Sequence, residues 1–523
     1  MIHDLRKLPE DAELQADVCV VGAGPVGIAV AAALADGHAD VLLLEGGGLE
    51  PDEAPPPRGV ARAAGLPYPL QETRVRAVGG TAHAWNLELP SGEMGALMRP
   101  LEPIDFVERE WVPGSGWPID LPALLPYYAR AYEFAGLPPT ALDRDRWLDE
   151  EPQPLPLDPT RLRSVPLHYA SRERFTLAAA GALPALERVQ VWHHADVVEL
   201  ETDASGRRVV GAVIRCADDG TEVTARANVF VLAGGGAENA RLLLASTTSS
   251  AAGIGNRHDL VGRCFMEHPQ GATGVFVPRS ADVVAQLSSY AMHQRHGTAV
   301  RWHLYLSEEI LRAERLLGYY AALWPTEADW LADDLRDLAL RAQQAFGAAA
   351  PLYAVSFQVE QAPNPDSRVT VARDASGDTA IVLDWRLTPL EYRTLVRAQQ
   401  IIQEEFHLRG LGTVFTKPYA DDTGGFETGT WRTYDFPITG AHHHMGTTRM
   451  HEDPRRGVVD ADCKVHDVDN LYVVGASVFP TSSHVNPTLT ATALGVRLGE
   501  HLHGLEALAR PASHAAQLPG GAT

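Results

Sequence analysis

Three glycines near the N-terminus have the spacing of a dinucleotide-binding turn. Gly22, Gly24 and Gly27 follow an apolar run and open an alanine-rich stretch, and Glu45 ends the next apolar run. Gly22 would permit the tight turn, Gly24 would let backbone N–H groups approach a pyrophosphate, and Gly27 would allow close packing of helix on strand. Glu45 would accept hydrogen bonds from ribose hydroxyls, and the helix N-terminus would face the phosphates. The segment predicts a dinucleotide site for either a nicotinamide or a flavin.

Three consecutive histidines, His442, His443 and His444, invite a metal-binding interpretation. Adjacent residues of an extended segment point to opposite faces, so three in a row cannot easily converge on one ion. The four cysteines are scattered, with no pair at the spacing of metal ligands. We therefore predict no metal site and no disulfide framework. A neutral imidazole does suit general-base catalysis near pH 7, which contributes about 10²–10⁴-fold in rate.

The elements around the glycine turn indicate a parallel sheet with helices. Residues 16–45 are predicted to form a strand, a turn, a helix and a second strand. Residues 189–232 contain short alternating segments divided by Asp and Gly turns, which indicate a small antiparallel sheet that returns to the parallel one. Residues 470–502 again read as strand, loop and helix and would rejoin this first domain. A Pro-rich stretch at residues 51–69 is predicted to run over the surface.

The middle of the chain, residues 271–442, has a different pattern and is predicted to be a substrate domain. Helices are expected at Glu327–Phe346 and Pro389–Phe406, and strands at Tyr353–Glu360 and Ala380–Trp385. A chain of 523 residues is too long for one compact core, so at least two domains are expected.

The charge of the chain excludes some partners. It has 44 Lys and Arg against 67 Asp and Glu, a formal net charge of −23, which would repel phosphate backbones and anionic lipid. We therefore expect no nucleic-acid binding and no membrane association. The N-terminus lacks the apolar stretch of a signal peptide, and no apolar run reaches membrane-spanning length, so a cytoplasmic location is expected. The oligomeric state is not predicted.

Four further segments resemble the glucose-methanol-choline (GMC) oxidoreductase family, most of all its branch of carbohydrate oxidases and dehydrogenases, which includes pyranose oxidase. They share the order and spacing of the family's motifs: Arg76–Trp85, Glu360–Arg368, His443–Met450, and Phe479–Thr481 with Asn486–Ala491. The resemblance implies a flavoprotein that binds FAD and oxidises an alcohol carbon to a carbonyl.

The resemblance also implies which residues contact FAD. Besides the four fingerprint residues, these are Arg76, Gly79, Gly80, Thr81, Val197, Ala233, Gly475, Asn486, Pro487 and Thr488. In the pyranose-oxidising branch, a histidine just before the tryptophan of the first segment is covalently attached to the flavin. This chain has Ala84 at that place and His83 one position earlier. We therefore expect FAD to be bound without a covalent link, with His83 as a loop residue beside it.

The family's catalytic pair corresponds to His443 and Asn486 here. His443 stands two positions before Met-Gly and would act as general base while flavin N5 takes the hydride. Asn486 would hold the substrate oxygen. It also resembles a helix N-cap, with Pro487 as the first helical residue. His484 departs from the family pattern, and together with His83, Gln361 and His442 it is a candidate for substrate contact.

The predicted fold class is α/β. A Rossmann-like FAD-binding domain, with a parallel sheet and a small antiparallel sheet, would comprise residues 14–100, 186–268 and 455–508. An α+β substrate-binding domain would comprise residues 101–185 and 269–454, and residues 509–523 would form a flexible tail.

The resemblance leaves the substrate open within one chemical class. A hydroxyl of a sugar, a glycoside or a related polyol would be oxidised, and aminoglycosides and C-glycosides are both candidates. Oxygen or another electron acceptor would complete the cycle. The alternative is a family member that keeps FAD without net redox chemistry, as some lyases of the family do.

Overall fold

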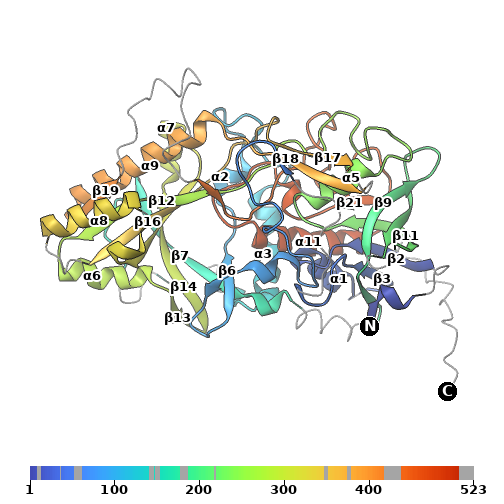
Figure 1. Ribbon diagram of the computed structural model, residues 1–523, viewed down its shortest axis with the longest axis horizontal. Coiled ribbons are helices and arrows are strands. Elements are labelled where there is room, and N and C mark those ends of the chain that lie inside the picture. Colours follow the sequence, from blue (N-terminus) through green and yellow to red (C-terminus); the bar gives the residue numbers. More distant parts are fainter. Residues whose placement is uncertain are drawn as a thin grey trace.

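The computed structural model describes residues 1–8, 13–35, 37–51, 62–139, 147, 153–176, 187–216, 220–331, 333–346, 351–373, 378–416 and 438–505. The predicted tail and most of the predicted Pro-rich excursion lie outside these residues. Figure 1 shows an elongated molecule with a large sheet towards each end. Strand β2 (Glu13–Val21) comes from the N-terminal part of the sequence and helix α11 (Thr488–His503) from its C-terminal part, yet both lie at the same end of the molecule.

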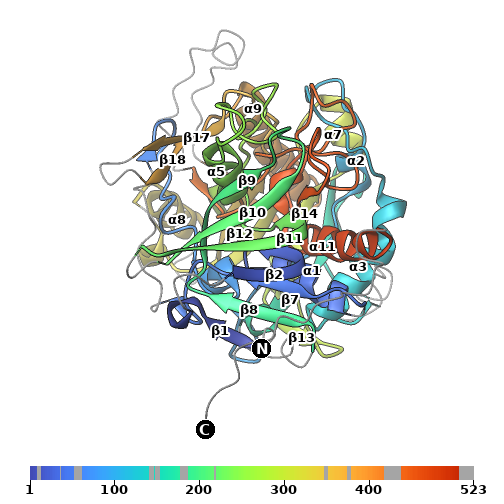
Figure 2. The same cartoon turned by 90° about the vertical axis from the view of Figure 1, so that its right-hand side faces the viewer.

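The first sheet contains the predicted glycine turn. Its eight strands run in the order β1-β8-β3-β2-β11-β10-β9, with β21 paired to β11. The bounds are β1 Ile2–Asp4, β8 Val189–His193, β3 Val41–Leu44, β11 Glu222–Leu232, β10 Val209–Arg215, β9 Asp196–Thr202 and β21 Leu471–Val473. Strands β1, β8, β3, β2, β11 and β21 pair in parallel, while β10 and β9 are antiparallel. The structure confirms the predicted combination of the two arrangements, seen end-on in Figure 2.

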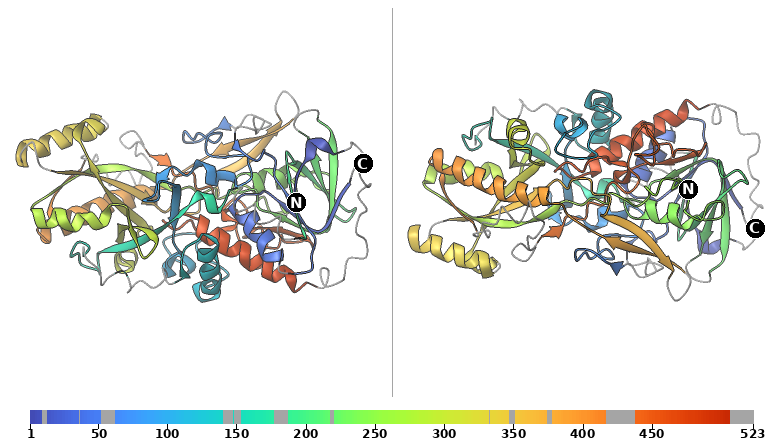
Figure 3. Two further views of the ribbon diagram at one scale, coloured as in Figure 1. Left: turned by 90° about the horizontal axis from the view of Figure 1, so that it is seen from below. Right: turned by 90° about the horizontal axis from the view of Figure 1, so that it is seen from above.

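Two helices at the first sheet are held unusually close by glycine. Helix α1 (Pro25–Ala35) follows the glycine turn and packs on α11, which in turn packs on α3 (Leu121–Phe134). A Cβ atom at Gly499 would stand 2.5 Å from the Cβ of Ala33, and one at Gly495 would stand 3.2 Å from the carbonyl oxygen of Val26. Because neither glycine has a side chain, the two helices approach closely, as the views in Figure 3 show.

The second sheet has ten strands in the order β19-β12-β16-β15-β14-β7-β6-β5, with β13 paired to β14 and β20 to β12. The bounds are β19 Gly412–Thr416, β12 Pro269–Pro278, β16 Leu352–Val359, β15 Tyr319–Thr326, β14 Thr298–Leu306, β7 Leu162–Ser171, β6 Met94–Met98, β5 Leu87–Glu88, β13 His293–Arg295 and β20 Thr439–Gly440. Helices α8 (Asp333–Phe346) and α9 (Pro389–Leu408) pack against it. Helix α9 begins with the capping box of Thr388 and Glu391, and it agrees with the predicted helix.

One expectation for the middle of the chain needs correction. The helix expected from Glu327 begins only at Asp333, because a separate 3-10 turn occupies Ala328–Trp330. The strand expected at Ala380–Trp385 is confirmed as β18 (Thr379–Asp384), which pairs with β17 (Arg368–Arg373) and β4 (Arg62–Ala63) in a small third sheet. Strands β17 and β18 lie beside helix α5 (Glu238–Ala245) of the first domain. The proposed domain boundaries remain a prediction.

Candidate active site

A large cavity opens where strands of the first sheet meet the starts of α1 and α11. Most of the predicted cofactor residues line it: Gly22, Gly24, Glu45, Arg76, Gly80, Thr81, Val197, Ala233, Gly475, Pro487 and Thr488. The predicted base His443 lines the same cavity, as do its neighbours His442 and His444. One cavity thus combines residues from both ends and the middle of the chain.

The glycine turn has the geometry that a dinucleotide needs. Gly22 has a φ of +101°, and a Cβ atom there would lie 2.8 Å from the carbonyl oxygen of Ala233. A Cβ atom at Gly27 would lie 1.8 Å from the carbonyl oxygen of Gly22, so only glycine lets α1 follow the turn so closely. At Gly24, by contrast, the nearest protein atom would be 3.9 Å away, and at Gly235 no atom lies within 4 Å. The cavity wall at these glycines therefore leaves room for a ligand rather than for protein.

Glu45 stands at the carboxyl end of β3, where a ribose-binding acid is expected. The side chain is buried, and it accepts hydrogen bonds from the backbone N–H groups of Ala23 at 3.0 Å and Gly47 at 2.9 Å. Burial raises the pKa of this carboxyl. The Glu45 side chain therefore bonds both the glycine turn and the loop after β3, and it lines the cavity between these two segments.

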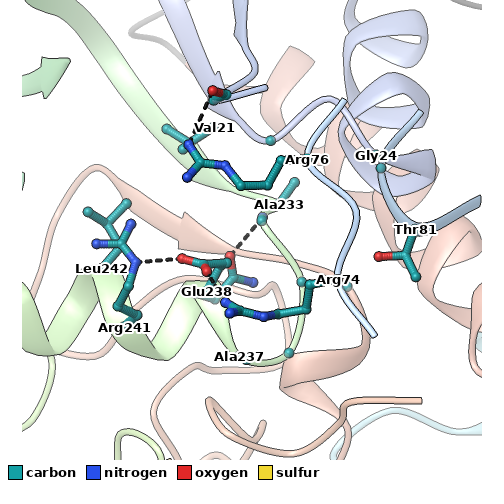
Figure 4. A pocket seen from close by; sticks show the side chains of 18 of the residues that line it. Val21, Gly24, Arg74, Arg76, Thr81, Ala233, Ala237, Glu238, Arg241 and Leu242 are labelled. Carbon is teal, nitrogen blue, oxygen red and sulfur yellow. Dashed lines mark hydrogen bonds and ion pairs between the residues drawn. The ribbon is translucent and has the colours of Figure 1, made fainter. Parts of the chain in front are cut away.

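Arginines form another wall of the cavity, shown in Figure 4. The guanidinium groups of Arg74 and Arg241 both pair with the carboxylate of Glu238, Arg241 at 2.5 Å. Arg76 pairs with Asp196 at 3.0 Å and donates to the carbonyl oxygen of Gly46 at 3.1 Å. Cationic side chains near a glycine turn at a helix N-terminus favour a bound pyrophosphate.

These residues fit FAD. The glycine-lined space, the N-terminus of α1 and the guanidinium groups suit its phosphates, and Glu45 suits a ribose. Helix α11 starts at the cavity with Thr488, so its positive end would face negative charge on a flavin ring. The helix contradicts one expectation. Its N-cap is Pro487 rather than Asn486, and no side chain caps the helix. The side-chain oxygen of Asn486, Oδ1, faces Gln358 instead.

His443 is held from both its backbone and its ring. Its backbone N–H donates to the two carboxylate oxygens of Glu267, at 2.8 and 2.9 Å. Its Nδ1 atom lies 2.9 Å from Nδ1 of His268. Burial lowers the pKa of the His443 imidazole well below 6.5, and the nearby histidines lower it further. His443 is thus a neutral imidazole at pH 7, which a general base must be.

Glu267 is the centre of a buried network beneath His443, the predicted base. It accepts the backbone N–H of His268 at 2.7 Å and a short hydrogen bond from the Tyr68 hydroxyl. The Tyr68 hydroxyl also lies 2.9 Å from Nε2 of His444. Burial raises the pKa of the Glu267 carboxyl to about 7. Residues 267, 443 and 444 are therefore positioned together, and the rings of His443 and His444 have different partners, as expected for adjacent residues.

Several predicted site residues do not line the cavity. Gly27 and Gly79 lie behind its wall, where Gly79 has a φ of +104° and a Cβ atom would stand 2.8 Å from Cα of Thr176. Asn486 is half-buried, and its Oδ1 accepts from Nε2 of Gln358 at 3.4 Å.

Three of the four residues predicted to contact substrate are held by protein groups away from the cavity. Gln361 is fully buried, and its amide bonds Glu267 N–H, the Trp385 indole and two backbone carbonyls. His83 Nε2 lies 2.9 Å from the carbonyl oxygen of Val78. His484 is buried against the Tyr305 ring, with centroids 4.5 Å apart. None of the three lines the cavity, whereas the exposed His442 does.

Sequence reasoning missed several residues of the site. Arg74, Glu238 and Arg241 are charged residues of the cavity wall, and His268 and Gln358 contact His443 and Asn486. The run Glu267-His268-Pro269 could have indicated His268 as part of the site, because it belongs to the family-like segments. Gln358 has no such signal, since its role depends on contacts across 90 and 128 residues of sequence.

Comparison with known proteins indicates an FAD-dependent oxidoreductase. Residues 17–251 match a family of FAD dependent oxidoreductases, and residues 363–495 match the GMC oxidoreductase family. Paromamine 6'-oxidase of Streptomyces fradiae is 26% identical over 93% of this chain and 91% of its own. The 6'''-hydroxyparomomycin C oxidase of Streptomyces lividus is 27% identical over 94% and 91%. C-glycoside 3-oxidase of Arthrobacter globiformis is 34% identical, but over only 24% of this chain and 21% of its own.

Solved structures share the fold. Pyridoxine 4-oxidase from Mesorbium loti superposes with a TM-score of 0.53 at 16% identity, over 94% of this chain and 99% of its own. A variant of the formate oxidase of Aspergillus oryzae superposes with a TM-score of 0.53 at 15% identity, over 94% and 98%. Fold, cavity and family matches together define an FAD-dependent oxidoreductase that acts on a hydroxyl group. The matches confirm the resemblance that the motifs predicted: the chain has a GMC oxidoreductase domain together with an FAD dependent oxidoreductase domain. No described helix is long and apolar enough to cross a membrane.

Proposed function

We propose that this enzyme oxidises a hydroxyl group of an aminoglycoside or a related amino sugar to a carbonyl, with His443 as the general base. The observation that carries the proposal is the neutral imidazole of His443 on the wall of the cavity that fits FAD. The substrate class is supported by two relatives that act on aminoglycosides and align along almost the whole chain. The likeness to a C-glycoside oxidase is confined to about a quarter of the chain.

The chemistry requires a hydride and a proton to leave the substrate carbinol. FAD, when bound, supplies the acceptor for the hydride on carbon. Nε2 of His443 takes the proton of the hydroxyl group, and the amide of Asn486 holds the oxygen as it becomes a carbonyl. Glu267 holds the backbone of His443, so the base has little freedom to leave this position.

We also infer that FAD is held without a covalent bond. Ala84 has no nucleophile, and His83 already uses Nε2 in a contact with the carbonyl oxygen of Val78 and does not line the cavity. Denaturation in acid should therefore release all of the yellow cofactor into the supernatant. Fluorescence that remains with the protein band on a denaturing gel would contradict this inference.

A substrate panel tests the proposed function. Aminoglycosides with free primary hydroxyls, C-glycosides, free pyranoses and simple alcohols would be assayed in parallel for peroxide formation and for dye reduction. We expect the highest kcat/KM with an aminoglycoside. Turnover confined to uncharged sugars would contradict the substrate class, and no turnover of any alcohol would contradict the function.

The base assignment is tested by His443→Ala. General-base help contributes about 10²–10⁴-fold in rate, so we expect kcat to fall by that factor while FAD stays bound. His407→Ala is the matched control, because His407 is exposed near the end of α9. Near-normal turnover of the His443 variant would refute the assignment.

A further inference from the structure

Backbone carbonyls of the loop before α11 determine which ring nitrogen of His268 carries a hydrogen. Nε2 of His268 lies 2.9 Å from the carbonyl oxygen of Ser483 and 3.2 Å from that of Ser482. A carbonyl oxygen can only accept a hydrogen bond, so Nε2 must be the protonated nitrogen. Burial lowers the pKa of His268 to about 4, and the ring is therefore neutral at pH 7. Its Nδ1 atom then has a lone pair and can only accept.

This lone pair decides the tautomer of His443. Nδ1 of His443 is 2.9 Å from Nδ1 of His268, and two lone pairs cannot form a hydrogen bond. Nδ1 of His443 must therefore carry the hydrogen. Because the His443 ring is also neutral, its Nε2 atom is left with the free lone pair. Among the described residues Nε2 has no hydrogen-bond partner, and His443 lines the cavity.

A second backbone carbonyl orients Gln358 on strand β16 in the same way. Nε2 of Gln358 donates to the carbonyl oxygen of His484 at 2.9 Å, which requires the NH₂ side of the amide to face this loop. Its Oε1 atom accepts from the Tyr320 hydroxyl at 3.2 Å. The same NH₂ group lies 3.1 Å from Nδ1 of His268 and 3.4 Å from Oδ1 of Asn486. Asn486 therefore turns its oxygen to Gln358, and its own NH₂ group is left to donate.

We propose that His268 and Gln358, which we name the polar platform, fix the hydrogen-bond polarity of the catalytic pair: His443 accepts at Nε2 and Asn486 donates at Nδ2. The inference rests on the proposed function, because it takes these two residues as the pair that handles the alcohol. A hydroxyl group needs one partner that accepts its proton and one that donates to its oxygen. The carbonyl oxygens of one loop, residues 482–484, orient both platform residues, which in turn make His443 an acceptor and Asn486 a donor. His268 and Gln358 are positioning residues, since they act through the pair.

The direct test is the tautomer of His443 in the holoenzyme. Nitrogen NMR of the enzyme labelled with ¹⁵N-histidine separates protonated from unprotonated ring nitrogens, and His443→Ala identifies the signals by their loss. We expect His443 with a hydrogen on Nδ1 and none on Nε2 at pH 7. A hydrogen on Nε2 would overturn the proposal whatever the activity. If His443→Ala retained turnover, the proposed base would fail, yet this measurement would still decide the polarity.

Variants of the platform add a kinetic test. In His268→Leu the acceptor is gone, so we expect kcat to fall by about 10²-fold, the lower end of general-base help, with little change in KM. In His268→Asn the amide oxygen can replace Nδ1 as acceptor, and most of the loss should be restored. Gln358→Met should lower kcat while Nδ1 of His443 stays protonated. Bound FAD content and His407→Leu serve as controls for folding. An unchanged kcat and tautomer in folded His268→Leu would overturn the proposal.

Discussion

His443 is held as a neutral imidazole on the wall of the candidate active site. Burial lowers the pKa of its ring well below 6.5, and the residue lines the cavity whose residues fit FAD. The cost of burying a charged imidazole thus keeps this ring unprotonated, as the proposed base must be. The motif before Met-Gly was enough to locate this residue from sequence, because the family pattern is local. Its partners His268 and Glu267 come from 175 and 176 residues away, and no local pattern could have paired them with it.

The lowered pKa of His443 predicts the pH profile of the reaction. The base works only when neutral, so kcat/KM should be level above pH 6.5 and should fall as the pH drops through the lower pKa of the folded enzyme. Measurement of kcat/KM from pH 4.5 to pH 9 checks this. Glu267→Gln is the control, because burial raises the pKa of the Glu267 carboxyl to about 7, within the range of the measurement. If kcat/KM instead rose with a midpoint above pH 7, and rose in the same way in the Glu267 variant, His443 could not be the base that controls the profile.

At the scale of elements, the cavity depends on how closely helix α1 can follow strand β2. Gly27 permits this approach, because any Cβ atom would overlap the carbonyl oxygen of Gly22. Glycines on α11 then let that helix reach the same site. The strand, turn and helix of this unit could be predicted from sequence, since spacing and apolar pattern agree. The packing of α11 on α1 could not, because the two helices are more than 450 residues apart in the chain.

Gly27→Ala should weaken FAD binding without unfolding the protein. Forcing one methyl group into this contact costs about 1–3 kcal/mol, which corresponds to about 5–150-fold in affinity if the whole cost is borne by the FAD-bound form. Gly504→Ala is the matched control, because it has a φ of −78° and a Cβ atom there would be 3.4 Å from the nearest atom. Titration of the apoenzyme with FAD measures both affinities. Equal affinity of the two variants would contradict the role given to Gly27.

A buried ion pair joins the segment at Arg109 to Glu360, directly after strand β16. Arg109 donates to both oxygens of Glu360, the side chains of both residues are fully buried, and Glu360 also accepts the backbone N–H of Gly318 at 2.9 Å. Arg109→Met would leave the carboxylate buried without its cation, which costs about 3–5 kcal/mol. The exposed pair of Arg207 and Asp469 offers a control, since Arg207→Met should change stability by less than about 1 kcal/mol. Urea denaturation measures both, and similar effects would contradict the account.

At the scale of the whole molecule, the site takes residues from the segments of both large sheets. The second sheet contributes Gln358 on β16 and Glu267 and His268 just before β12, while the first domain contributes the loop before α11. The sequence predicted the α/β class, the two kinds of sheet and FAD, because each depends on local pattern or on recognisable motifs. The strand β18 could also be predicted, within one residue at each end. Only tertiary contacts, which leave no local signal, place this strand in a small third sheet beside the cavity.

The most direct measurement is anaerobic mixing of the FAD-loaded enzyme with an aminoglycoside that has a free primary hydroxyl, followed by the visible absorbance of the flavin. We expect this absorbance to be bleached in the native enzyme, and at least about 10²-fold more slowly in His443→Ala. Flavin colour that persists with every aminoglycoside, glycoside and sugar would contradict alcohol oxidation by this enzyme, and bleaching at the same rate in both proteins would contradict His443 as its base.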